Sequence, residues 1–185
     1  FIKKKLPLIH YPGLERTMEA SQTPPKETPV AEVGATPPAK PVAKKEEAPP
    51  QPLVDNGDGA VTDPKTGLMW KKTDAWLDAK KFFKWSDHKA YVDDINKKKF
   101  AGYSDWRIPT KAEAAGLIDK VKQCMDKNGT MIPLDPVFDA GCASNTWISE
   151  CTAEKIIRFD FKVGVDMPYP GNDIWSSISL VRKPG

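Results

Sequence analysis

The residues best suited to chemistry in this sequence are its three cysteines. Cys124, Cys142 and Cys151 include no C-x-x-C pair, and the only histidines are His10 and His88. Such spacing does not predict a zinc site. In an oxidising compartment Cys142 and Cys151 could form a disulfide across a short segment, and three buried free thiols are the alternative.

A second group of candidate residues lies near the C-terminal end. The proline and glycine content of Asp166–Asp173 predicts a loop. Asn172 and Asp173 are suited to a turn with local side-chain bonds. The candidate binding residues of this region are Asp166, Tyr169, Asn172, Asp173 and Trp175.

No catalytic group is predicted from the remaining motifs. Ser104 and Asp105 lie near His88 in the sequence, but Ser104 lacks the Gly-x-Ser-x-Gly context that exposes a nucleophilic serine. The sequence also contains no phosphate loop and no dinucleotide-binding motif. We therefore predict a noncatalytic protein without a resident metal, for which calcium is the only cofactor to consider.

Composition separates a tail from the part of the chain that can position these residues. Nine of the 18 prolines lie between Pro24 and Pro52, whereas all six tryptophans lie at or beyond Trp70. Such a proline-rich segment cannot sustain a helix or a central strand. The sequence predicts an extended tail over residues 1–53 and a folded domain over residues 54–185.

Charge and the N-terminal residues bear on partners and location. The chain has 28 Lys and Arg against 25 Asp and Glu, with no basic stripe, so nucleic acid is not a predicted partner. Lys3, Lys4 and Lys5 could contact anionic lipid, at about 1 kcal/mol each. The first residue is Phe1, which fits removal of a secretory signal. Removal of such a signal predicts an extracytoplasmic chain, periplasmic or on the cell surface. No apolar run approaches the roughly 20 residues of a membrane span, so we expect the chain to be soluble or peripherally attached.

Hydrophobic periodicity predicts an α+β domain with two helices and a short-stranded antiparallel sheet. One helix begins at Ser86 or Asp87, and the second follows Thr110 with an apolar face that extends to Val121. Strands are predicted over residues 60–62, 68–70, 146–149, 155–161 and 176–182.

The segment Gly102–Glu113 joins a strand end to the second helix. Thr110 and Glu113 have the spacing of a capping box, and Pro109 disfavours helical geometry at the residue before it. Asp105 and Arg107, which flank Trp106, are predicted to form a structural polar pair. The residues that we expect to be structural are Tyr103, Asp105, Trp106, Arg107, Pro109, Thr110 and Glu113.

Several of these segments occur in the order typical of a known family. The hairpin segment 55–70, the Gly102–Thr110 segment, Trp147–Ser149 and the final Val181-Arg182 resemble the Legionella collagen-like protein C-terminal domain family, a bacterial domain of unknown function. The resemblance runs from about Asp55 to Arg182. It implies a fold similar to C-type lectins and formylglycine-generating enzymes, and an exported, envelope or surface setting.

The resemblance does not carry a function with it. Formylglycine-generating enzymes need a cysteine pair near the end of the domain, and no cysteine follows Cys151. Sugar-binding C-type lectins use a Glu-Pro-Asn or Gln-Pro-Asp triplet with Trp-Asn-Asp, of which only Asn172-Asp173 is present. We expect a noncatalytic binding or accessory subunit of a larger envelope or surface assembly, with other protein subunits as partners. A calcium-dependent carbohydrate-binding module and a cysteine-dependent oxidase are the alternatives.

Overall fold

The computed structural model describes residues 51–184 of the chain. Lys3, Lys4 and Lys5 and nearly all of the predicted tail lie outside the described residues, so their proposed contacts with lipid and partners stay predictions. The boundary between residues 53 and 54 also stays a prediction. Among the helices within residues 51–184, none has the length and apolar character needed to cross a bilayer.

The first sheet confirms the N-terminal hairpin. Its strands, all antiparallel to their neighbours, lie in the order β1 (Val54–Asp55), β2 (Ala60–Asp63), β3 (Leu68–Lys71) and β9 (Val181–Arg182). Asp63 organises the turn between β2 and β3, because its carboxylate accepts the Lys65 N–H at 2.9 Å and the Thr66 hydroxyl at 2.6 Å. Such short-range bonds are the reason that Asp favours turns.

The described residues contain three α-helices, one more than predicted. Their bounds are α1 (Ala75–Ala79), α2 (His88–Lys97) and α3 (Lys111–Gly116), with short 3-10 helices at Trp85–Asp87 and Phe100–Gly102. α1 forms because the Asp74 carboxylate caps it, accepting the Leu77 N–H at 2.9 Å. α2 begins directly after Asp87, which confirms the predicted position, but the Asp87 side chain makes no capping bond and instead accepts the Ser86 hydroxyl at 2.8 Å.

The apolar face predicted for the second helix is too long. α3 ends at Gly116, and the side chain of Val121 is 90% exposed rather than packed on the core. The cause is a turn centred on Asp119, whose carboxylate accepts the backbone N–H groups of Val121 and Lys122 at 2.8 and 3.1 Å. Asp competes in this way with helical hydrogen bonding.

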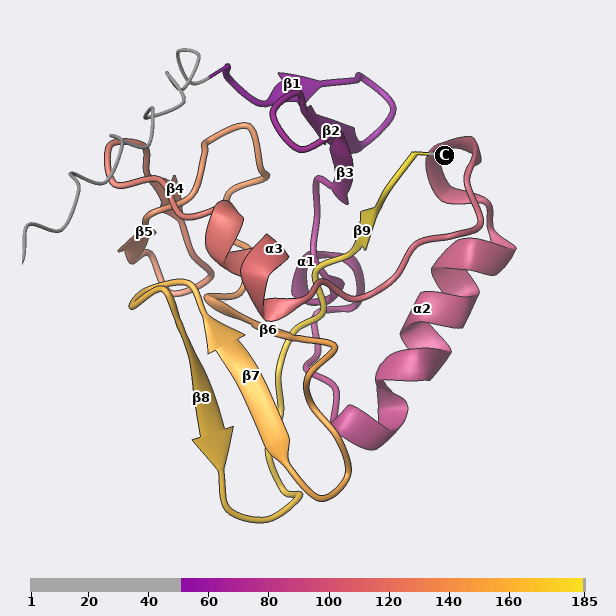
Figure 1. Cartoon of the computed structure of the whole chain (residues 1–185), viewed down its shortest axis with the longest axis vertical. Helices are drawn as coiled ribbons and strands as arrows, with labels where there is room; N and C mark the ends of the chain where they lie inside the picture. The colour runs from indigo at the N-terminus through magenta and orange to yellow at the C-terminus, as the bar shows by residue number, and fades with distance from the viewer. Residues whose placement is uncertain (1–50, 185) are drawn as a thin grey trace, which may run out of the picture. The chain divides into compact units, whose positions relative to one another are not determined.

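Two further sheets complete the fold (Figure 1). One pairs β4 (Cys124–Met125) with β5 (Met131–Ile132), and the other has the order β6 (Asn145–Trp147), β7 (Ile156–Asp160) and β8 (Val165–Tyr169). The prediction of a loop over Asp166–Asp173 is therefore wrong in its first half. β8 is hydrogen-bonded to β7 alone, and such an edge position tolerates Pro168. The predicted strand 176–182 is regular only at Val181–Arg182.

The combination of helices and antiparallel sheets confirms the α+β class. These elements enclose one apolar core. Four aromatic side chains dominate it, each no more than 2% exposed: Trp70, Trp106, Trp147 and Phe159. They come from β3, the segment before α3, β6 and β7. The core thus holds the sheets and α3 together, and it leaves β8 at the outer edge of its sheet (Figure 1).

Candidate functional site

The residues predicted to be structural lie at a junction of distant segments. Trp106 is buried and donates its indole N–H to the Phe100 carbonyl at 3.0 Å. The Asn96 side chain of α2 holds the Trp106 backbone at both N–H and C=O, each at 2.8 Å. The Pro109 carbonyl accepts the Ser149 N–H at 2.9 Å. This segment therefore ties α2 to the residues after β6, and in place of the predicted strand end it has only an isolated bridge between Arg107 and Val181.

The predicted capping box is present. The Thr110 hydroxyl accepts the Glu113 N–H at 3.1 Å, and the Glu113 carboxylate accepts the Thr110 N–H at 2.8 Å. Arg107 adds two parallel bonds to the same carboxylate, at 2.8 and 2.7 Å. Hydrogen bonding from Arg107 is the main reason that the pKa of Glu113 is lowered.

The predicted pairing of Asp105 with Arg107 is wrong. The Asp105 carboxylate instead accepts the Arg182 Nε–H at 2.7 Å, while Arg107 binds Glu113. The Arg182 guanidinium also lies 3.7 Å from the ring centroid of Tyr103. Asp105 and Arg107 thus bind different partners, Arg182 near the C-terminal end and Glu113 of α3. Both pairs support a structural role for the motif.

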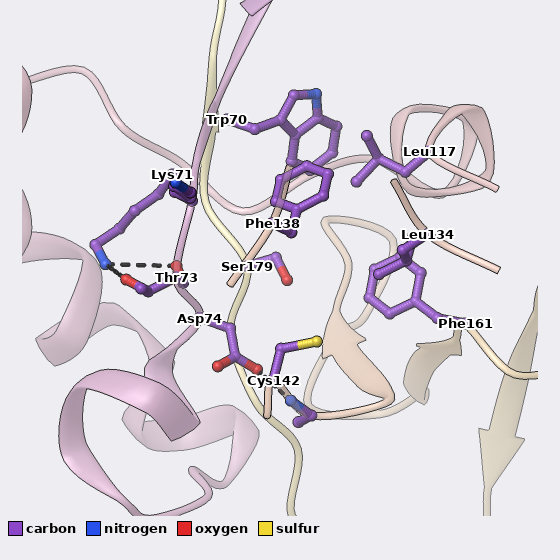
Figure 2. A pocket seen from close by; sticks show the side chains of 12 residues that line it. Trp70, Lys71, Thr73, Asp74, Leu117, Leu134, Phe138, Cys142, Phe161 and Ser179 are labelled. Carbon is purple, nitrogen blue, oxygen red and sulfur yellow. Dashed lines mark hydrogen bonds between the residues drawn. The ribbon is translucent and has the colours of Figure 1, made fainter. Parts of the chain in front are cut away.

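A small cavity lies near the centre of the domain, above the Asp74 carboxylate (Figure 2). Its volume is about 30 Å³, and apolar side chains such as Trp70, Leu117 and Phe138 form most of its wall. Such a volume holds about one water molecule. The cavity is therefore too small for a substrate or a sugar.

Asp74 serves as a buried hub rather than as a reactive carboxylate. It accepts the N–H groups of Leu77 and Ala143 at 2.9 and 2.8 Å and the Ser177 hydroxyl at 2.8 Å. Burial is the main reason that its pKa is raised. The three bonds join α1 to segments far along the chain and offset part of the cost of burying a carboxylate.

A wider groove of about 560 Å³ runs beside Leu53, Ile118 and Val121. Lys122 and Asp135 on its rim bind each other. Asp119 is engaged by backbone N–H groups, as described above. Asp119, Lys122 and Asp135 of this groove are therefore engaged within the domain.

The three cysteines are buried and free. The Cys124 thiol donates to the Phe138 carbonyl at 3.6 Å, whereas Cys151 accepts the Ile157 N–H at 3.3 Å. Three buried free thiols were the alternative in the sequence prediction, and a Cys142–Cys151 disulfide in an oxidising compartment stays a prediction. Burial raises the pKa of each thiol.

The predicted binding residues divide into two groups. Asp166 lies in β8 and binds Lys111 of α3 at 2.7 Å, away from the others. Asp173 binds Lys84 at 2.7 Å, which lowers its pKa. Asn172 is exposed in the turn after β8. Tyr169 and Trp175 are brought together with Asp173 by two cations that the sequence analysis had not selected.

Those cations are Lys84 and Arg158. The Lys84 ammonium lies 5.0 Å from the ring centroid of Trp175, and the Arg158 guanidinium lies 4.6 Å from that of Tyr169. Arg158 also donates to the Tyr169 hydroxyl at 3.0 Å and to the Trp175 carbonyl at 2.8 Å. The two aromatic side chains are therefore held in place before any ligand arrives.

This cluster continues onto β8. Met167 pairs with Arg158 in the β7–β8 register, and opposite residues of antiparallel strands share a face. We call this surface the Trp175 face and define it as Lys84, Arg158, Met167, Tyr169, Asp173 and Trp175. Within this face Met167 and Trp175 are 37 and 47% exposed, and Val163 and Val165, which flank it along the β7–β8 hairpin, are 63 and 48% exposed.

The Trp175 face shows no ready-made metal site. Within residues 51–184, no three side chains of His, Cys, Asp or Glu converge to hold a metal ion. The Asp173 carboxylate, which a calcium site here would need, is bound to Lys84. Binding of calcium at Asp173 would first have to break that pair.

Comparison with protein families gives one match, in which residues 59–182 match the Lcl C-terminal domain. The chain belongs to the Lcl C-terminal domain family. The match confirms the family predicted from the hairpin and Gly102–Thr110 segments. The comparison with curated proteins and that with solved structures each returned no match. The matched range of this Lcl C-terminal domain contains both the structural junction and the whole Trp175 face.

Sequence reasoning missed Lys84, Arg158 and Met167. Arg158 lies between apolar neighbours in a predicted strand, so alternation could have placed it on the outer face of that strand. Lys84 is one of several lysines before α2 and gave no such signal. Its role depends on Asp173 and Trp175, which the fold brings near from the other end of the domain.

Proposed function

We propose that this Lcl C-terminal domain is a noncatalytic binding module of an extracytoplasmic envelope or surface assembly, and that it docks a protein partner through the Trp175 face. We further propose that it has the C-type-lectin-like fold that its family resemblance implies. The observation that carries the docking role is the half-exposed Trp175, which Lys84 and Arg158 hold beside exposed Met167.

Composition supports a protein as the partner. Aromatic residues, Met and Arg are enriched at the centres of protein interfaces, and Trp, Tyr and Arg dominate their binding energy. The Trp175 face contains each of these types, and the ion pair of Lys84 with Asp173 supplies a polar rim. Because the side chains are already ordered, docking would cost little additional side-chain entropy.

The two alternative functions have less support. Calcium-dependent sugar binding would need Asp173, which Lys84 engages, and a free ring face on Trp175, over which Lys84 lies. A cysteine-dependent oxidase would need a reactive thiolate. The three thiols of this domain are buried and have raised pKa values, so they are poorly suited to that role.

Site-specific photo-cross-linking in the native host tests this proposal. A photoreactive residue would replace Val165, which borders the Trp175 face, and in a matched control it would replace Met131, an exposed apolar strand residue of another sheet. We expect a discrete protein adduct in the envelope fraction from position 165 and none from position 131, and the adduct should survive addition of a chelator. Equal labelling at both positions would contradict docking through this face, and loss with chelator would favour the calcium-dependent alternative.

A further inference from the structure

The structure assigns Cys124 and Cys142 as a disulfide-forming pair that leaves Cys151 free. Each of the two thiols lies close enough to affect the pKa of the other. The pairing differs from that favoured by sequence spacing, and it concerns the stability of the domain rather than the Trp175 face.

The backbone holds the two cysteines next to each other. Asp126 and Cys142 form a parallel β-bridge. On either side of it, Lys127 N–H donates to the Cys142 carbonyl at 2.8 Å and Gly141 N–H to the Met125 carbonyl at 2.7 Å. These bonds fix the register of the two segments.

This register puts both thiols on one face. Residues two apart in an extended segment point to the same side, so Cys124 shares a face with Asp126. Cys142 lies opposite Asp126 across the bridge and therefore points to that side as well. Cys124 and Cys142 are therefore diagonal neighbours on this face, so disulfide formation needs side-chain rotation together with a local approach of the two segments.

Cys151 is placed differently. Its sulfur accepts the Ile157 N–H at 3.3 Å at the start of β7, and its pKa is influenced by burial and by Ile157 without any effect of another cysteine. A link from Cys142 to Cys151 would require separation of the Cys142 segment from its bridge to Asp126. The fold thus favours one pairing of the three cysteines.

The oxidant is an external disulfide, such as that of glutathione or of a thiol oxidoreductase. One cysteine, as its thiolate, attacks the external disulfide and releases one external thiol, which leaves a mixed disulfide. The second cysteine attacks the chain's own sulfur in that mixed disulfide and releases the second external thiol. Two protein thiols are oxidised, one external disulfide is reduced, and the two protons pass to the departing thiolates.

Burial determines when the reaction takes place. The pKa of each thiol is raised mainly by burial, so the folded chain contains little thiolate for the first attack. We expect the bond to form during folding, while the thiols are still accessible. Once formed, it closes the segment that contains β4 and β5, next to the Ala143 N–H that binds Asp74 at 2.8 Å.

The test is a disulfide map of the full chain. The chain is refolded from denaturant in reduced and oxidised glutathione, its free thiols are alkylated, and its peptides are identified by mass spectrometry. We expect a peptide that links Cys124 to Cys142, alkylated Cys151, and a thermal midpoint raised by roughly 10 °C over the reduced chain. Three alkylated cysteines, or a link that includes Cys151, would overturn the assignment.

Two variants sharpen this result. Cys151→Ser keeps a hydrogen-bond acceptor for Ile157 and should retain both the link and the rise in midpoint. Cys124→Ser should leave Cys142 alkylated and remove the rise, and a link from Cys142 to Cys151 in this variant would contradict the geometry. Should either variant fail to fold, the map of the unaltered chain decides. The outcome is independent of cross-linking at Val165, so the two proposals fail separately.

Discussion

The junction before α3 permits a prediction in which one residue separates two stabilising effects. Glu113 closes the capping box through the Thr110 N–H and also receives the bidentate ion pair from Arg107. Glutamine can replace glutamate in a capping box but cannot form the ion pair. Glu113→Gln therefore removes the charge alone, whereas Glu113→Ala removes both interactions.

The expected magnitudes follow from exposure. The side chains of Arg107 and Glu113 are 43 and 18% exposed, so solvent screens the pair and we assign it about 0.5–1 kcal/mol. Loss of a capping interaction costs about 1 kcal/mol more. We predict that the free energy of unfolding at pH 7 falls by about 0.5–1 kcal/mol in Glu113→Gln and by about 1.5–2 kcal/mol in Glu113→Ala.

The same residue predicts a pH dependence with a definite sign. Because the pKa of Glu113 is lower in the folded chain than in the unfolded chain, its ionised form stabilises the fold above the ordinary Glu pKa of 4.5. That contribution is lost as the pH falls through the lower, folded-state pKa. Wild type and Glu113→Gln should therefore differ at pH 7 and converge near pH 2.5.

Urea unfolding of the three proteins at both pH values measures this effect. Arg107→Met in the Gln background is the control, since it should add little once the carboxylate is gone. An undiminished difference between wild type and Glu113→Gln at low pH would refute the assignment of the stabilisation to the ion pair. Equal stability of the Gln and Ala variants would refute the capping contribution.

Two other substitutions test the packing around the junction by the same unfolding assay. Gly59→Ala should lower the free energy of unfolding by about 1 kcal/mol more than Gly57→Ala does. Both glycines have positive φ, but only at Gly59 would a Cβ lie 2.8 Å from the Phe100 ring. Equal effects of the two substitutions would contradict this packing. Tyr91→Phe should lower the free energy of unfolding by about 1–2 kcal/mol, because it removes the hydroxyl that donates to the partly buried Asp78 carboxylate. A variant as stable as wild type would contradict a stabilising role for this hydrogen bond.

The parts of the fold that were predicted correctly depend on signals contained in a few neighbouring residues. The turn of the N-terminal hairpin depends on Asp63, which binds residues two and three positions ahead. The capping box depends on Thr110 and Glu113, which are three residues apart. Such bonds form whatever the rest of the chain does, so their pattern in the sequence is sufficient.

The incorrect predictions concern partners that lie far along the chain. Asp105 was assigned to its neighbour Arg107, but its actual partner, Arg182, is 77 positions away. β8 was assigned to a loop because its proline outweighed its alternation, and only pairing with β7 reveals the strand. The candidate site follows the same rule. Tyr169 and Trp175 were selected as binding residues from a short stretch of sequence, and that role stays a prediction, whereas Lys84 and Arg158 required the fold.

The most direct test of the central claim, docking through the Trp175 face, uses a Trp175→Ala variant of the full chain. The partner that this variant retains is co-purified from the native envelope. The amount retained is read from the cross-linked adduct at position 165. This variant keeps the backbone carbonyl that Arg158 binds, and the half-exposed ring contributes little to the core, so the thermal midpoint should stay within about 2 °C of wild type. We predict a loss of retained partner on the order of 10-fold or more, with Met131→Ala unchanged. Undiminished retention by a folded Trp175→Ala variant would contradict docking through the Trp175 face.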